Sequence, residues 1–178
     1  MDNYREEIVV KKNRLVNNVL YALIVIVMAF SVMLAAISIS ALTFSENFIL
    51  QIIWTVIYGG IAFLIWWKKD TLRMEYEYTF TNGELDFACV YGNKKRKNLG
   101  SMRVKNVEAC GLVASGSFKR YVSMPGLKKK NWFLNRDADL LYFFYQKDGA
   151  KNMIIMEPTQ EMVSMIKIYL SRGVFQTN

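Results

Sequence analysis

Residues 15–45 have the sequence LVNNVLYALIVIVMAFSVMLAAISISALTFS, and residues 47–67 have the sequence NFILQIIWTVIYGGIAFLIWW. Glu46 lies between the two stretches and is the one charged residue from Leu15 to Trp67. Each stretch is long enough to cross a bilayer, because a helix rises about 1.5 Å per residue and the hydrocarbon core is about 30 Å thick. We expect these two spans and not a signal peptide, since the apolar part of a signal peptide spans about 7–15 residues. We therefore predict a two-helix transmembrane hairpin at residues 15–73, with spans at about 18–43 and 48–67.

The charges around these stretches predict the orientation of the hairpin. The basic residues that flank it are Lys11, Lys12, Arg14, Lys68, Lys69 and Arg73. The connection between the stretches carries no Lys or Arg. The positive-inside rule therefore predicts a multi-pass protein of the plasma membrane, with both termini in the cytoplasm and a short outer turn near Thr43–Phe48.

Residues 74–178 have the size of one cytosolic domain and a basic composition. Hydrophobic residues make up 53% of the chain, and the net charge is +8. From Met74 onward, 16 Lys and Arg oppose 10 Asp and Glu, a net charge of +6. Each basic side chain near an anionic leaflet contributes about 1 kcal/mol of attraction. The tether makes this leaflet the nearest polyanion, so we expect a lipid partner and no nucleic acid.

Alternation of apolar and polar residues predicts strands in this domain. Strands at 75–81 and 84–91 flank Asn82-Gly83, a pair that tolerates the positive φ angles of a type I′ turn, and Gly92-Asn93 predicts a second turn. Further strands are expected at 99–104, 107–113, 118–122, 131–134, 140–146 and 152–156. Residues 1–14 are polar and predict a cytosolic lead-in, either a short helix or a disordered arm.

A single amphipathic helix is expected at residues 158–171. Pro158 is predicted to open it, because proline at the first helical position loses no hydrogen bond. Its apolar residues recur at helical spacing and are Met162, Val163, Ile166, Tyr169 and Leu170. The predicted fold is therefore α+β, with a transmembrane hairpin followed by a mainly antiparallel β roll or barrel that one C-terminal helix closes.

This order of elements resembles the bacterial pleckstrin-homology-like membrane proteins. The hairpin Tyr76–Tyr91 and the closing strand with Pro158 and its helix carry the likeness. The whole chain is also similar to an uncharacterised family of short two-span membrane proteins from Gram-positive bacteria, through residues 75–87, 103–111 and 131–136. The resemblance implies a pleckstrin-homology-like domain and brings no catalytic residues with it.

Four adjacent cations, Lys94, Lys95, Arg96 and Lys97, are expected in a turn between strands. They are candidate contacts for anionic lipid headgroups or for a protein partner. Charged residues at such a tip can instead discourage pairing of the sheet edge. The sequence leaves both interpretations open.

A second basic stretch, Lys128, Lys129 and Lys130, precedes Trp132 and Phe133. Cations beside aromatic rings suit insertion into a membrane interface, and they also suit stacking on single-stranded nucleic acid. Alternatively, both rings belong to the core and follow a basic loop. We take the three lysines and Trp132 as further candidate contacts.

Residue types that support catalysis are scarce. The chain has no histidine, and Cys89 and Cys110 have no partner ligands at metal-binding spacing. We therefore expect no catalytic residue, no cofactor and no metal. The predicted function is a non-enzymatic, membrane-anchored interaction module that binds a protein partner, anionic lipid headgroups, or both.

The alternative function is that of an accessory subunit of a larger membrane complex, such as a transporter, with the hairpin making the contacts. Small residues recur at packing distance in the first span, Ser31 with Ala35 and Ala36 with Ser40. They predict packing within the hairpin or a homodimer face.

Overall fold

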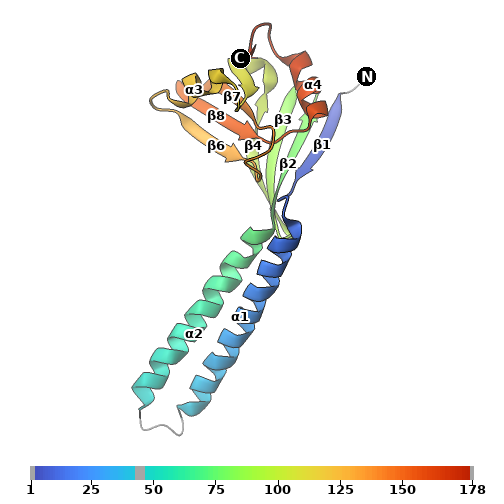
Figure 1. Cartoon of the computed structure of the whole chain (residues 1–178). Coiled ribbons are helices and arrows are strands. Elements are labelled where there is room, and N and C mark those ends of the chain that lie inside the picture. Colours follow the sequence, from blue (N-terminus) through green and yellow to red (C-terminus); the bar gives the residue numbers. More distant parts are fainter. Residues whose placement is uncertain (1–2, 43–46, 177–178) are drawn as a thin grey trace. The chain divides into compact units, whose positions relative to one another are not determined.

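The computed structural model describes residues 3–42 and 47–176, which form two compact units (Figure 1). A β unit contains the residues up to Lys12, Glu75–Val90 and the chain from Lys94 onward. A hairpin unit contains Asn13–Met74 and Tyr91–Asn93.

The hairpin unit consists of two long helices and a short 3₁₀ helix. Helix α1 (Arg14–Ala41) packs against α2 (Phe48–Lys68), and η1 (Lys69–Arg73) follows directly. Both long helices are long and apolar enough to cross a membrane. Of the outer turn predicted near Thr43–Phe48, residues 43–46, which include Glu46, lie outside the described residues.

The seam between α1 and α2 is made of small and polar residues. Ser31 and Ser38 of α1 and Ala62 of α2 are its buried members. The serine and threonine hydroxyls of the seam bond within their own helices: Ser31 Oγ donates to the carbonyl of Val27, and Thr55 Oγ1 donates to that of Gln51, both at 2.8 Å. Most of the large apolar side chains of both helices are exposed, and none is buried.

The small-residue pairs of the first span have different surroundings. Ser31 is buried and Ala35 is half-buried in the hairpin seam, as packing within the hairpin requires. Ala36 and Ser40 lie on the exposed side of α1. The predicted homodimer face therefore remains a prediction for this second pair.

The hairpin unit also includes the turn after strand β3. The backbone N–H of Gly92 donates to the carbonyl of Arg73 at 3.0 Å. The Arg73 guanidinium lies 3.9 Å from the centroid of the Tyr21 ring, a cation–π contact. Gly92 and Asn93 have φ angles of 57° and 58°, so the turn predicted at this pair is present.

The β unit contains two sheets. The four-stranded sheet has the order β1-β2-β3-β4, and the five-stranded sheet has the order β6-β8-β7-β5-β9. The described pairings are antiparallel except for β6 with β8 and β5 with β9. The strands are β1 (Tyr4–Val9), β2 (Met74–Thr81), β3 (Glu84–Tyr91), β4 (Lys95–Arg103), β5 (Ala109–Leu112), β6 (Lys128–Trp132), β7 (Leu141–Lys147), β8 (Ala150–Met156) and β9 (Phe175–Gln176).

The predicted hairpin β2–β3 is confirmed. Asn82 and Gly83 have φ angles of 47° and 89°, as a type I′ turn requires. A Cβ atom on Gly83 would lie 2.6 Å from the Tyr169 ring, so the close approach of the C-terminal helix also needs glycine here. Alternate residues Tyr78 and Phe80 of β2 are buried, as the sequence pattern predicts.

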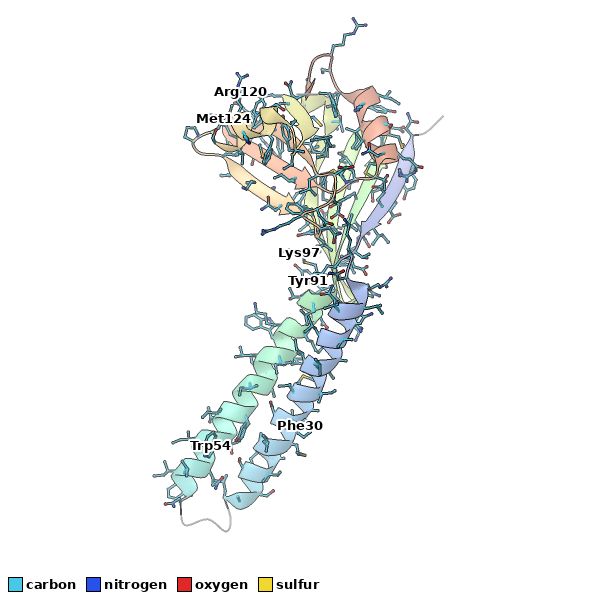
Figure 2. All side chains as sticks on the ribbon, viewed as in Figure 1. Phe30, Trp54, Tyr91, Lys97, Arg120 and Met124 are labelled. Atoms are coloured by element: carbon cyan, nitrogen blue, oxygen red, sulfur yellow. The ribbon has the colours of Figure 1, made fainter. Side chains whose placement is uncertain are left out.

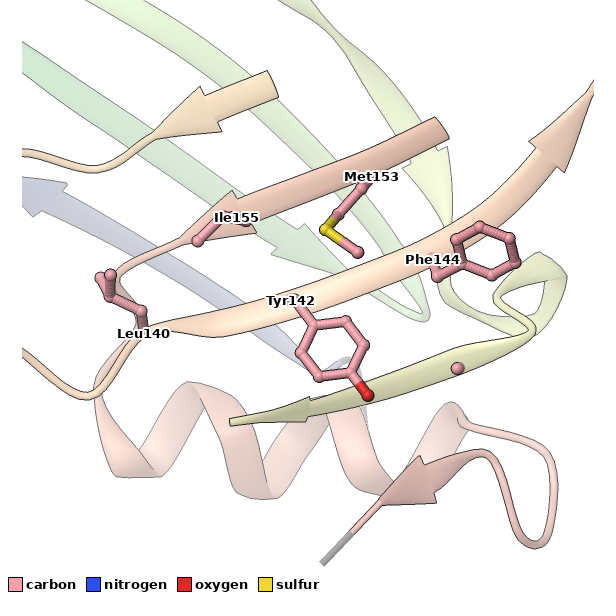
Figure 3. Packing of buried hydrophobic residues seen from close by; sticks show 6 residues of the cluster. Leu140, Tyr142, Phe144, Met153 and Ile155 are labelled. Carbon is pink, nitrogen blue, oxygen red and sulfur yellow. The ribbon is translucent and has the colours of Figure 1, made fainter. Parts of the chain in front are cut away.

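Strands β7 and β8 are buried on both faces. Leu141–Phe144 and Met153–Met156 are buried at every position, which explains why their sequences are continuously apolar. Because strand side chains alternate, Tyr142 and Phe144 share one face of β7. With Met153 and Ile155 they form the cluster in Figure 3, which residues 118–127 cover.

Helix α4 (Gln160–Tyr169) is the predicted C-terminal helix, and its first turn differs from the prediction. It buries Met162, Val163 and Ile166. The helix begins at Gln160 and not at Pro158, because Thr159 is the N-cap residue: its Oγ1 accepts the N–H of Met162 at 3.3 Å. A threonine at this position satisfies one of the free N–H groups of the first turn.

The prediction that residues 1–14 form a helical or disordered arm is wrong for Tyr4–Val9, because these residues form strand β1. The strand pairs antiparallel with β2, from Tyr4 opposite Thr81 to Val9 opposite Tyr76. Glu7 and Val9 point inward, and Tyr4, Glu6 and Ile8 are exposed. The edge of β2 supplies a pairing partner that lies about 70 residues away in the chain, which no local pattern reveals.

The strand expected at 118–122 is also wrong, because these residues belong to helix α3 (Gly116–Val122). Phe118, Tyr121 and Val122 pack on the cluster of β7 and β8, and their spacing suits one face of a helix. Other strand boundaries also differ: β4 begins at Lys95 and not at 99, β5 spans Ala109–Leu112 and not 107–113, β6 covers Lys128–Trp132 in place of 131–134, and β8 begins at Ala150 and not at 152.

Candidate interaction surfaces

The first basic stretch, Lys94–Lys97, is called the β4 basic run. All four side chains are exposed, but they do not project together from a turn. Lys94 lies in the turn, and the other three open strand β4, which corrects the sequence prediction. Since strand side chains alternate, Lys95 and Lys97 share one face, and Arg96 lies on the other.

Arg96 belongs to a face of mixed charge. Its Nε lies 2.7 Å from Oε2 of Glu77 on β2. It also lines an open hollow of about 630 Å³ on the four-stranded sheet, whose lining residues are Tyr4, Glu6, Thr79, Asp86, Phe87, Ala88, Arg96 and Asn98. Glu77, Glu6 and Asp86 reduce the positive potential around Arg96. Lys94, Lys95 and Lys97 therefore carry the net positive charge of the run.

The second basic stretch, Lys128–Lys130, is called the β6 lysines. The structure places it in strand β6 and not in the loop expected from the sequence. All three side chains are exposed. Lys130 Nζ lies 5.2 Å from the centroid of the Trp132 ring, two residues further along the strand. The β6 lysines thus lie on a strand at the edge of a sheet, with Lys128 and Lys130 on one face and Lys129 on the other.

Trp132 is a core residue, so its proposed role as a membrane contact is corrected. Only 9% of it is exposed, and its ring centroid lies 4.7 Å from that of Phe87. The Tyr78 hydroxyl donates to the carbonyl of Trp132. Burial raises the pKa of this tyrosine far above its ordinary value, so it stays a hydrogen-bond donor. A ring held in this way cannot insert into a lipid interface.

A further basic pair, Arg103 and Lys105, was not singled out by the sequence reasoning. Both side chains are exposed and line a hollow of about 400 Å³ beside the β2–β3 turn, together with Thr81, Asn82, Gly83, Glu84 and Tyr169. Val104 between them is buried, and its N–H donates to the carbonyl of Gly83 at 2.9 Å. In the sequence, two cations that flank one apolar residue could have indicated that both cations point to the same exposed side.

Strand β1 is attached to α4 through Glu7, which is 8% exposed. Its carboxylate accepts the N–H of Thr159 at 2.9 Å, the hydroxyl of the same residue, and Nε of Arg5 at 2.7 Å. The Arg5 guanidinium also pairs with Glu161 of α4. Sequence reasoning missed this network, because it depends on the position of β1.

The chain between β1 and α1 is attached to the loop after β6. Asn135 is 9% exposed; its Nδ2 donates to the carbonyl of Val10 at 3.0 Å and to Glu157 Oε1 at 2.7 Å. The backbone N–H of Lys12 donates to Asn135 Oδ1 at 2.8 Å. Lys12 Nζ lies 2.6 Å from Asp137 Oδ2 and lowers the pKa of that carboxyl. These contacts hold residues 10–12 within the β unit.

Within residues 3–42 and 47–176, no group of three or more His, Cys, Asp or Glu side chains is arranged to hold a metal ion. Cys89 and Cys110 are buried and are not joined in a disulfide. Burial raises the pKa of the Cys110 thiol well above its ordinary value, so it stays protonated near neutral pH.

We expect both thiols to react slowly with iodoacetamide at pH 8 while the protein is folded. Alkylation needs a thiolate and access to it, so the rate should be at least roughly a hundredfold lower than in denaturant. Mass spectrometry of quenched samples measures the rate at each cysteine. Rapid alkylation of the folded protein would contradict the buried positions of Cys89 and Cys110.

Two mostly antiparallel sheets and a C-terminal helix make up the β unit, an arrangement of the pleckstrin-homology-like class. The family model described as a bacterial PH-like domain (DUF6106) matches residues 1–176, so the chain belongs to this family. The match confirms the resemblance noted in the sequence. Comparison with curated proteins and with solved structures gave no match. PH-like domains are generally non-enzymatic binding modules, which suggests an interaction module here.

Proposed function

We propose that this protein is a non-enzymatic interaction module anchored in the plasma membrane. Helices α1 and α2 span the bilayer, and the chain termini and the β unit lie in the cytoplasm. The basic residues on the flanks of the hairpin, including Arg14, Lys68 and Arg73, support this orientation.

The distribution of residues in the hairpin unit supports insertion into lipid. In water, a pair of helices buries apolar residues and exposes polar ones. Here Ser31 and Ser38 are buried, while Phe30 and Val56 are 58% and 68% exposed (Phe30 and Trp54 are labelled in Figure 2). Small residues at the seam and large apolar ones outside are typical of helices in a bilayer, because lipid solvates apolar side chains.

We propose that the β4 basic run binds anionic headgroups. The observation that carries this is the hydrogen bond from Gly92 to Arg73, which attaches the β3–β4 turn to the residues that end the second apolar helix. Lys94 lies in the same turn, next to Asn93 of the hairpin unit, and neighbouring Cα atoms are about 3.8 Å apart. Chain connectivity therefore holds Lys94 beside the hairpin unit, and an anionic surface attracts charges that come within its Debye length of about 8 Å.

The test uses the full chain, because β1 at residues 4–9 completes the four-stranded sheet. Ser101 of β4 is exposed, and a Ser101→Cys variant can be labelled with an environment-sensitive dye while the native cysteines stay buried. The labelled protein is placed in nanodiscs of phosphatidylcholine alone or mixed with phosphatidylglycerol. We expect a blue shift of the dye only with the anionic lipid, and high salt should reverse it.

The blue shift reports docking of the β unit on the anionic lipid surface. Replacing Lys94, Lys95 and Lys97 by Gln should lower the equilibrium constant for this docking by roughly a hundredfold, because each lysine contributes about 1 kcal/mol. The matched control replaces three other exposed cations, Lys119, Lys147 and Arg172, and should change it little. Equal emission in neutral and anionic nanodiscs would sink the lipid proposal and leave protein binding.

The alternative is an accessory subunit that contacts a larger membrane complex through the hairpin. Gly59 and Gly60 of α2 favour it, because an added Cβ at either position meets nothing within 4 Å, so a neighbouring helix could approach closely. Pull-down from gently solubilised membranes distinguishes the two functions. Partners that persist after deletion of residues 74–178 bind the hairpin, and partners that are lost bind the β unit.

A further inference from the structure

Strand β6 forms one end of the five-stranded sheet. It pairs on one side with β8, from Lys128 opposite Asn152 to Trp132 opposite Met156. Within the described part of the chain, no strand pairs with its outer side. A strand at the edge of a sheet presents unpaired N–H and C=O groups to any chain that can align with it.

Tyrosine hydroxyls satisfy the carbonyl groups at the C-terminal end of β6. The Tyr76 hydroxyl donates to the carbonyl of Asn131 at 3.4 Å, and the Tyr78 hydroxyl donates to that of Trp132. For Lys128–Lys130, the described hydrogen bonds are those to β8. The open part of the edge therefore coincides with the β6 lysines.

The charge of this edge selects its occupant. In the described residues, no carboxylate lies within ion-pair distance of the three ammonium groups. An added strand that carried lysines would meet like charges, and a purely apolar strand would leave these cations without a counter-charge. An extended segment with Asp or Glu side chains supplies both the backbone groups and the opposite charge.

We infer that the outer edge of β6 binds an acidic, extended segment of a partner protein by strand addition. Backbone hydrogen bonds to β6 provide the alignment, and carboxylates on the segment pair with the β6 lysines. This deepens the proposed function by naming the partner of the β unit. It rests on the interaction-module part of that proposal and is independent of lipid binding at the β4 basic run.

The probe is a fluorescein-labelled peptide of alternating Glu and Val, added to the full chain in phosphatidylcholine nanodiscs and followed by fluorescence anisotropy. Two control peptides separate charge from strand pairing. One has alternating Lys and Val, and the other keeps the Glu-Val sequence but is N-methylated at every backbone nitrogen. We expect binding of the first peptide only, since methylation removes the backbone donors and leaves the charge.

Replacing the three β6 lysines by Glu should weaken binding of the Glu-Val peptide by about tenfold or more. The matched control, Lys119→Glu with Lys147→Glu and Arg172→Glu, should leave the affinity within about twofold. Slow alkylation of the native cysteines checks that each variant is folded. Equal binding of the N-methylated peptide, or equal loss in both variants, would overturn the inference.

The lipid assay distinguishes this inference from the proposed function. A β6 variant that loses the peptide but still docks on anionic lipid supports strand addition. If the peptide does not bind and the β6 variant loses lipid docking, the β6 lysines face lipid and the inference is overturned. If the peptide binds while the β4 basic run proves irrelevant to lipid, the inference stands and the lipid proposal fails.

Discussion

Replacing Trp132 by Ala should lower the unfolding free energy of the β unit by about 3–5 kcal/mol. The side chain is 9% exposed and packs on Phe87, so its removal leaves a cavity between core residues. Hydrogen exchange of β7 and β8 amides under increasing denaturant measures the change, because these buried strands report opening of the whole unit.

The matched control for this prediction is Trp67→Ala in α2. That side chain is 63% exposed, and its loss should leave exchange in β7 and β8 unchanged. The pair also tests the earlier interpretation of Trp132 as a membrane contact. If the Trp132→Ala protein keeps native stability but its β unit docks more weakly on anionic lipid, that interpretation is restored and the buried position is contradicted.

Replacing Glu7 by Ala should cost about 3 kcal/mol of β-unit stability. The change leaves the Thr159 N–H and hydroxyl without their acceptor and removes the partner of Arg5 at 2.7 Å. Loss of one member of a buried, hydrogen-bonded charge pair typically costs about 3–5 kcal/mol, and the partial exposure of Arg5 reduces this figure. Strand β1 and the first turn of α4 should exchange fastest.

Glu6→Ala is the control within the same strand. Glu6 points to the exposed face, where its carboxylate accepts the Tyr4 hydroxyl at 3.0 Å, so its loss should change stability by at most about 0.5 kcal/mol. Equal destabilisation by the two substitutions would mean that negative charge on β1, and not the buried network, stabilises the unit.

Much of the local structure could be predicted because its signal lies within a few residues. Continuous apolar stretches predict the two long helices, and Asn82-Gly83 predicts a turn, since few pairs tolerate two positive φ angles. Alternation in β2 and helical spacing in α4 depend only on which face of the element is buried. The bacterial PH-like class was indicated by a resemblance in the hairpin Tyr76–Tyr91 and the closing strand and helix, and the family match confirms it.

The candidate surfaces were predictable as charges but not as positions. The sequence shows three adjacent lysines before Trp132, yet it cannot tell a basic loop from a sheet edge. The edge exists because β6 pairs with β8, about 24 residues further along the chain. Likewise, the sequence does not show that Arg96 pairs with Glu77 on β2, while the sheet brings the two side chains together.

The two long apolar helices, several strands and the overall charge therefore follow from composition and short-range pattern, which the order of residues contains directly. Tertiary structure decided that Tyr4–Val9 is a strand, that 118–122 is a helix over the β7–β8 cluster, and that Trp132 lies in the core. Each of these depends on contacts between segments far apart in the chain. Such contacts bury apolar area and satisfy backbone groups, and together these gains outweigh the local preference of a short segment.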